Sequence, residues 1–319
     1  MVVRENKMEV SHYNDLWVEK YRPIKLKDIL LSEENQTHFE TLGKDIPNML
    51  FYGSPGTGKT TLAKIIVKDI LKCQYLYINA SDENGIDTIR NKVISFAQTR
   101  SLDGNKKVVI LDEFCGTTGD AQRILRNVME EYSDSTRFVL TSNYLNKIIE
   151  PIKSRCLLFK LIPEENAILS RCVEILIKEK IKIEDSQKRL LPKFVKDRYP
   201  DLRRTINDLQ KFSASGELQI LEENISSNFA DSLFKKLLDK ESVLNLRKIV
   251  IENEKIFNND YQQLMKSLFD LVYASSLPEI KKKMVLLDLG EHMYRDNFVL
   301  DHEINFYCCL IAMENSLKS

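Results

Sequence analysis

Short apolar runs alternate with amphipathic segments over the first half of the chain. Runs rich in apolar and β-branched residues stand at 49–52, 75–79, 108–111, 138–141 and 157–161. Between them, apolar residues recur at three- and four-residue spacing at 60–72, 86–99, 119–132 and around 145–152. Because alternating strands and helices fold into a parallel sheet covered on both faces, residues 1–162 predict an α/β domain.

The strand pattern stops at Pro163. Three helices are predicted after it, at 164–182, 185–198 and 201–213. Asp201 follows Pro200 and is the expected N-cap of the third helix, because its carboxylate can accept from a free backbone N–H. Gly216 marks a break. The pattern therefore predicts a small helical domain over 163–227, and the helical spacing beyond it predicts an all-helical domain over 228–319.

Composition narrows the class of protein without naming an activity. The 319 residues are 43% hydrophobic and 29% charged, as in an ordinary globular protein, and no apolar run approaches a membrane span. The N-terminus is too polar for a signal peptide. Six cysteines form no C-x-x-C pair, so we expect reduced thiols, with Cys308 and Cys309 in a core. The expected location is the cytoplasm, the host cytoplasm for a viral protein, or the nucleus for a eukaryotic one.

The most specific motif is GSPGTGKT at 53–60, which fits G-x-x-x-x-G-K-S/T between a predicted strand and a predicted helix. Such a loop binds phosphates, because successive backbone N–H groups and the helix N-terminus face the anion. The alternative is a glycine turn between two core elements. The residues expected to contact nucleotide are Gly53, Ser54, Pro55, Gly56, Thr57, Gly58, Lys59, Thr60 and Thr61.

Asp112 and Glu113 follow the apolar run at 108–111, which is the predicted central strand about 50 residues after the loop. Ligands bind at the carboxyl ends of strands in such sheets. We expect Lys59 to contact the β- and γ-phosphates, and Thr60 and Asp112 to hold Mg²⁺. Glu113 would orient and activate the attacking water. By itself, an apolar run ending in Asp-Glu also suits a strand that leads into a polar loop.

Three further polar residues are candidates for the same chemistry. Asn143 ends the strand at 138–141 and would lie beside the γ-phosphate, or else cap a turn. Arg155 is either a surface ion-pair partner or a finger that enters a neighbouring subunit's site. Arg203 would close the helical domain onto the nucleotide, or lie solvated. Spacing alone leaves both alternatives open for each arginine.

These elements together resemble AAA+ ATPases, and more narrowly sliding-clamp loader subunits, namely the small subunits of replication factor C and the large subunit of the tailed-phage clamp loader. The resemblance covers about residues 16–212. It is carried by LWVEKYRP at 16–23, NASDE at 79–83 with GID and IRN after it, DAQ at 120–122 with LR at 125–126, IIEPI at 148–152, SRC at 154–156 and DLRR at 201–204.

The resemblance implies an AAA+ P-loop NTPase domain, a helical lid domain and a C-terminal all-α collar for oligomerisation. ATP and Mg²⁺ are the implied cofactors. Arg155 would act in trans on the neighbouring subunit's ATP, and Arg203 on its own. The residues implied near the adenine are Val18, Tyr21, Arg22 and Pro23.

The implied function is that of an ATPase subunit of a DNA polymerase sliding-clamp loader. It would use ATP to open the clamp and load it on primer–template DNA during DNA replication. Its partners would be the clamp, the other subunits of a ring-like pentamer, and DNA. Hydrolysis would be stimulated by DNA and clamp.

Basic residues near the NASDE and DAQ segments are the candidates for DNA contact, namely Arg90, Lys92 and Arg126. They would touch phosphates and so recognise structure rather than sequence; the alternative is solvated helix charge. Gln122 is a hypothetical link from DNA contact to Glu113. Asn84 stands where many relatives carry a basic residue, which puts one phosphate contact in doubt.

Two rival functions remain from the sequence. A different AAA+ machine, such as a helicase loader or branch-migration motor, would share the nucleotide site but not the SRC element or the N-terminal signature. A structural subunit would bind ATP without hydrolysing it, which the set of Lys59, Asp112, Glu113 and Asn143 argues against.

Overall fold

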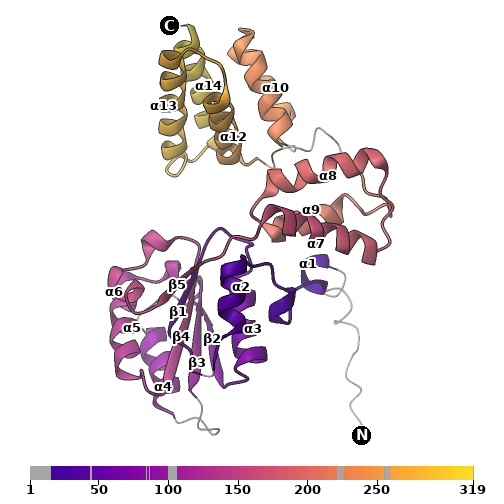
Figure 1. Cartoon of the computed structure of the whole chain (residues 1–319). Helices are drawn as coiled ribbons and strands as arrows, with labels where there is room; N and C mark the ends of the chain where they lie inside the picture. The colour runs from indigo at the N-terminus through magenta and orange to yellow at the C-terminus, as the bar shows by residue number, and fades with distance from the viewer. Residues whose placement is uncertain are drawn as a thin grey trace, which may run out of the picture. The chain divides into compact units, whose positions relative to one another are not determined.

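A computed structural model describes residues 16–43, 45–83, 85, 87–99, 106–220, 226–254, 257 and 259–318 (Figure 1). The chain divides into two compact units, which are described separately. The first unit holds the described residues up to Ile183 together with Arg198–Leu218. The second holds Glu184–Asp197 and the described residues from Gln219 onward.

The first unit is built on a sheet of five parallel strands in the order β2-β3-β4-β1-β5. The strands are β1 (Met49–Tyr52), β2 (Tyr75–Asn79), β3 (Lys107–Asp112), β4 (Thr136–Ser142) and β5 (Leu157–Lys160). Tyr52 pairs with Ser142, and Asn79 pairs with Asp112, so these four strands end at one edge. The parallel sheet confirms the predicted α/β fold and brings the segments after β1, β3 and β4 together.

Helices cover both faces of this sheet, with α2 and α3 on one side and α4, α5 and α6 on the other (Figure 1). Each face has its own apolar core, one including Phe51, Leu62 and Ile110, the other Leu111, Leu125 and Leu140. The helices of the unit are α1 (Trp17–Lys20), α2 (Glu33–Glu40), α3 (Lys59–Ile65), α4 (Ser95–Gln98), α5 (Gly119–Glu131), α6 (Glu150–Lys153), α7 (Glu165–Lys178) and α9 (Leu202–Lys211).

Three of the predicted helices are irregular. The helix predicted over 60–72 is α3 continued by a π-helical turn at Ile66–Ile70, and the one predicted over 86–99 is a π-helical segment at Thr88–Ile94 continued by α4. The segment around 145–152 is a 3₁₀ turn at Leu145–Lys147 followed by the separate α6. Pro151 lies in the first turn of α6, where its missing N–H costs nothing, but a proline cannot continue an earlier helix.

Helix α9 begins at the predicted cap. The Asp201 carboxylate accepts a hydrogen bond from Arg204 N at 2.9 Å. Helix α9 packs against α7 and α1, and Trp17 N donates to Gln210 Oε1 at 2.9 Å. This packing holds the N-terminal segment against α9 within the first unit.

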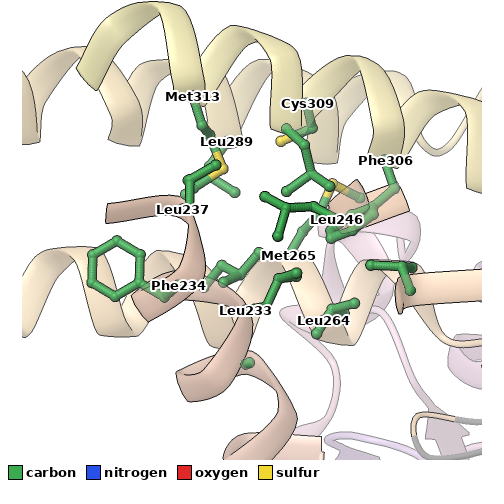
Figure 2. Packing of buried hydrophobic residues seen from close by; sticks show 14 of the residues in the cluster. Leu233, Phe234, Leu237, Leu246, Leu264, Met265, Leu289, Phe306, Cys309 and Met313 are labelled. Atoms are coloured by element: carbon green, nitrogen blue, oxygen red, sulfur yellow. The ribbon is translucent and has the colours of Figure 1, made fainter. Parts of the chain in front are cut away.

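The second unit is all-helical. Its helices are α8 (Asp185–Arg198), α10 (Ser226–Leu238), α11 (Val243–Glu252), α12 (Tyr261–Ala274), α13 (Glu279–Arg295) and α14 (His302–Lys318). Figure 2 shows Leu237, Leu289 and Met313 meeting in the core between them. Burying each such side chain stabilises the unit by roughly 1.5–3 kcal/mol.

Cys309 is buried in this core, but Cys308 is exposed on the other side of α14, so the prediction that both are core residues is half wrong. Adjacent positions on a helix point about 100° apart.

Among the described helices, none combines the length and the apolar character needed to cross a membrane.

Candidate active site

A pocket opens in the first unit at the carboxyl ends of β1, β3 and β4. Residues from the phosphate loop, the N-terminal signature, the strand ends and the start of α9 line it. The predicted site residues that line it are Val18, Tyr21, Arg22, Pro23, Pro55, Gly56, Thr57, Gly58, Lys59, Thr60, Thr61, Glu113, Asn143 and Arg203. Segments far apart in the sequence therefore converge on one cavity.

The pocket also has a largely apolar wall, which the sequence did not predict as a surface of the site. It includes Ile29, Leu30, Pro163, Leu202 and Ile206. Only the first two follow the N-terminal signature closely in the chain, so no local pattern connects the five. A planar apolar group fits such a wall, while the phosphate loop supplies polar groups at the other end.

The phosphate loop depends on glycine at three positions, including Gly53, where a Cβ would lie 2.5 Å from Leu161 O. Gly56 and Gly58 have φ of 72° and 90°, a region that side chains other than glycine rarely adopt. A Cβ on Gly56 would also lie 1.8 Å from Asp201 Oδ1, the N-cap of α9. The loop and the start of α9 therefore approach closely only because position 56 has no side chain.

Lys59 is buried at the start of α3, with its ammonium folded back over the loop. Its Nζ donates to Gly53 O at 2.8 Å and Ser54 O at 2.7 Å. Burial lowers the pKa of Lys59 to about 8, and the nearby Asp112 carboxylate only partly opposes this. An anion bound beside Lys59 would raise this pKa toward its ordinary value.

This pKa predicts that ATP binding is coupled to proton uptake. Above about pH 8, free protein holds Lys59 largely neutral, whereas phosphates in contact with it favour the ammonium. We expect ATP affinity to fall as pH rises through 8, with a proton taken up on binding at pH 9. Calorimetry in buffers of different ionisation enthalpy measures that proton. Lys59→Arg, which stays charged, should bind ATP without it; proton uptake unchanged in that variant would contradict the assignment.

Asp112 is the centre of a network of hydroxyl groups. Its Oδ1 accepts from Thr60 Oγ1 at 2.8 Å and Thr141 Oγ1 at 2.5 Å, and its Oδ2 accepts from Tyr77 OH at 2.8 Å. Within the described residues no group of three His, Cys, Asp or Glu side chains forms a metal cage. One hydroxyl and one carboxylate nevertheless fit Mg²⁺, because that ion takes few protein ligands and completes its shell with phosphates and water.

Glu113 is held beside this network in an uncommon backbone conformation, with φ of 53° and ψ of 39°. Its backbone N donates to Thr141 Oγ1 at 3.0 Å. Its side chain is exposed, and Oε2 accepts from Ser81 Oγ at 2.6 Å. Thr141 therefore orders both acids, through the carboxylate of Asp112 and the backbone of Glu113. The sequence pointed to both acids; it placed Ser81 only in the NASDE segment, with no role at the acids, and did not single out Thr141.

Asn143 follows β4, which lies between the strands that lead to the loop and to the acids. The turn after β4 is closed by Ser142, whose Oγ accepts from Tyr144 N at 3.1 Å. Ser142 rather than Asn143 therefore caps this turn. Arg203 lies in the first turn of α9, exposed and facing the same pocket.

Comparisons with known proteins agree with this geometry. Residues 49–163 match the AAA family model, described as ATPases associated with various cellular activities. Residues 165–222 match the lid-domain model of the sliding-clamp-loader large subunit. The replication factor C small subunit of Methanococcus vannielii is 36% identical over 264 residues, which cover 80% of this chain and 79% of that protein. The chain belongs to the replication factor C small-subunit family.

Other members give the same result. Replication factor C subunit 2 of Arabidopsis thaliana is 36% identical over 275 residues, covering 82% of this chain and 78% of that protein. The small subunit of Sulfolobus acidocaldarius is 41% identical over 217 residues, covering 64% of this chain and 65% of that protein. The chain therefore matches less than two thirds of the length of this more similar archaeal relative.

Arg155 does not lie in the pocket. It precedes β5, and its carbonyl accepts from Asn48 Nδ2, just before β1, so it stands at the amino end of the sheet. The loop and the acids stand at the carboxyl end. Its guanidinium donates to Glu130 of α5 and to Pro151 O at 2.7 Å. Arg155 and the phosphate loop of its own chain therefore lie at opposite ends of the sheet.

Gln122 is buried in α5 and spans to the segment before α6. Its Nε2 donates to Lys147 O at 3.1 Å, and its Oε1 accepts from Ile149 N at 2.9 Å. These two hydrogen bonds connect Gln122 to the segment that leads to Arg155, while the Glu113 carboxylate accepts from Ser81.

The three candidate DNA contacts lie outside the pocket. Arg90 is exposed on the turn before α4, Lys92 pairs with Glu83, and Arg126 donates to Asn127 Oδ1 at 2.6 Å. Position 84, where the doubtful phosphate contact falls, lies outside the described residues.

Proposed function

We propose that the chain is the ATPase subunit of a sliding-clamp loader, which uses ATP to open a clamp and place it on primer–template DNA during replication. The observation that carries this proposal is the pocket itself. It unites a phosphate loop, Glu113 and Asn143 with Arg203 from a lid that matches a clamp-loader family, and Asp112 is hydrogen-bonded to Thr60 at its edge. Membership of the replication factor C small-subunit family supports the same function.

The residues of the pocket suit ATP hydrolysis. Lys59 and the loop amides would bind the phosphates, and Thr60 with Asp112 would hold Mg²⁺. The bound ion would neutralise charge that develops on the phosphate oxygens. Glu113 would accept a proton from the attacking water, and Asn143 would position that water.

The adenine would lie against the apolar wall, beside Val18, Tyr21, Arg22 and Pro23. The hydroxyl of Tyr21 donates to Glu179 Oε1 at 2.5 Å, which ties the N-terminal segment to the end of α7. Burial, with Glu179 beside it, raises the pKa of Tyr21 to about 12, so the hydroxyl stays a donor at any working pH. Arg203 would reach the same nucleotide from α9 as the lid closes.

The proposed domains are a nucleotide-binding domain over 1–162, a lid over 163–227 and an oligomerisation collar over 228–319. The matches at 49–163 and 165–222 support the first boundary. An exposed apolar stripe on α13 supports the collar: Ile280, Met284, Leu287 and Tyr294 follow one another at four-, three- and seven-residue spacing, and Leu287 is 73% exposed. Other subunits of a ring-like pentamer are its proposed partners.

DNA contact by Arg90, Lys92 and Arg126 has a measurable signature. Each phosphate contact contributes about 0.9 to the slope of log affinity against log salt for duplex DNA. We expect Arg90→Ala to reduce that slope by about one in the assembled complex with ATP and primed DNA. Lys266→Ala is the matched control, because Lys266 is a cation on α12 of the second unit that pairs with Asp270. Equal slopes for wild type and Arg90→Ala would remove Arg90 from the DNA surface.

The decisive measurement is ATPase activity with primed DNA, with and without a sliding clamp. A clamp loader is expected to be stimulated by both together. Stimulation by DNA alone favours another AAA+ machine, such as a helicase loader or branch-migration motor. ATP binding without turnover under every condition indicates a structural subunit.

A further inference from the structure

Tyr77 reaches the proposed Mg²⁺ site from a neighbouring strand. It lies on β2, where it pairs in register with Ile110, two residues before Asp112 on β3. Alternate residues of a strand share a face, so Tyr77, Ile110 and Asp112 point to the same side of the sheet. Two residues of strand span about 6.6 Å, which the length of a phenol side chain bridges.

The hydroxyl of Tyr77 forms a hydrogen bond with Asp112, and a lysine of α3 contacts the Tyr77 ring. Tyr77 OH donates to Asp112 Oδ2 at 2.8 Å, on the oxygen opposite the one that Thr141 holds. The ammonium of Lys64, on α3, lies 4.3 Å from the centre of the Tyr77 ring and helps to fix its orientation. Asp112 is 6% exposed, so its carboxylate is aimed mainly by these protein donors.

Burial, with the bond to Asp112, also raises the pKa of Tyr77 well above its ordinary value.

We propose that Tyr77 is a positioning residue for Mg²⁺, which fixes the Asp112 carboxylate so that its free lone pairs and the Thr60 hydroxyl meet the ion together. The proposal rests on the proposed function, because it needs Mg²⁺ with ATP at this site. Groups that hydrogen-bond to a metal-binding carboxylate commonly alter metal affinity about 10- to 100-fold when removed. Tyr77 is 37% exposed, so water partly replaces its hydroxyl and the lower end of that range applies.

Tyr75 provides a matched control on the same strand and face. It pairs in register with Val108, four residues and about 13 Å before Asp112, too far for its hydroxyl to reach the carboxylate. It also lies near a lysine, with Lys68 Nζ 5.9 Å from its ring centre. Phenylalanine at either position keeps the ring and removes only the hydroxyl.

The test measures the affinity of the full chain for ATP in excess Mg²⁺ and in EDTA, with thermal unfolding of the nucleotide-free protein as a folding check. We expect Mg²⁺ to strengthen ATP binding to wild type and to Tyr75→Phe equally. In Tyr77→Phe that gain should shrink about tenfold, with the affinity in EDTA unchanged. The Mg²⁺ concentration for half-maximal hydrolysis should rise by a similar factor.

A double variant shows whether Tyr77 acts through Asp112. Tyr77→Phe added to Asp112→Asn should change the Mg²⁺ gain no further than Asp112→Asn alone. Additive losses, or equal losses in Tyr75→Phe and Tyr77→Phe, would overturn the positioning role. A full Mg²⁺ gain in Tyr77→Phe would overturn it while leaving the proposed function intact. No Mg²⁺ gain in wild type would overturn both.

Discussion

Glu113→Gln is expected to reduce the turnover of ATP about 10²- to 10³-fold, because an amide cannot accept the proton of the attacking water. ATP affinity should change little. The Glu113 side chain has Ser81 as its partner, and a glutamine oxygen can still accept that hydrogen bond. The substitution therefore tests the proton-accepting role of Glu113 separately from ATP binding.

The measurement is steady-state hydrolysis with primed DNA and clamp, together with ATP binding by a fluorescent analogue. Asp120→Asn is the control, because Asp120 is an exposed acid in the first turn of α5, removed from the pocket and paired with Arg123. It loses the same charge and should hydrolyse at the wild-type rate. A Glu113→Gln protein that turns over as fast as wild type would remove Glu113 from the chemistry.

Under the trans role that the resemblance implies for Arg155, Arg155→Ala is expected to lower hydrolysis about 10³-fold or more in the assembled ring, the effect typical of arginine fingers. The physical reason is position: Arg155 stands at the amino end of the sheet, and its own phosphate loop stands at the carboxyl end. In the trans role it would stabilise charge in a site presented by another subunit. Arg155→Ala should therefore leave ATP binding by the isolated chain unchanged.

Mixing experiments isolate the trans contribution. Arg155→Ala subunits retain Lys59, and Lys59→Ala subunits retain Arg155, so in a random mixture about a quarter of head-to-tail neighbours combine both intact halves. Activity should partly return in mixed rings, whereas each pure variant stays inactive. Lys153→Ala, two residues away on α6 and paired with Glu150, is the control for local damage. Failure to recover at every mixing ratio would contradict the trans role.

The sheet was predictable because its strands are apolar runs bounded by polar turns. The run at 49–52 is β1 without any change, and the runs at 138–141 and 108–111 are three and two residues shorter than β4 and β3. The phosphate loop and the acid pair were predictable for a related reason. Each is a short contiguous motif, so the residues that carry out its chemistry are neighbours in the sequence.

Other parts of the site left no such local signal. Tyr77, Ser81 and Thr141 contact the acids only because β2, β3 and β4 lie side by side, and strand order is not encoded in any one segment. Cys308 shows the same limit in the second unit, since an apolar stretch does not say which side of α14 faces the core. The π-helical turns at Ile66–Ile70 and Thr88–Ile94 have no sequence explanation that we can identify.

By itself, the sequence determined the α/β fold, the phosphate loop, the two acids and the family. Local spacing and residue type are sufficient for these, because hydrophobic periodicity and contiguous motifs act over a few residues. Only the tertiary structure decided which hydroxyls aim Asp112, which apolar residues wall the pocket, and that Arg155 faces away from its own loop. Those facts depend on the order in which parallel strands pair, and on which end of the sheet each connecting segment reaches.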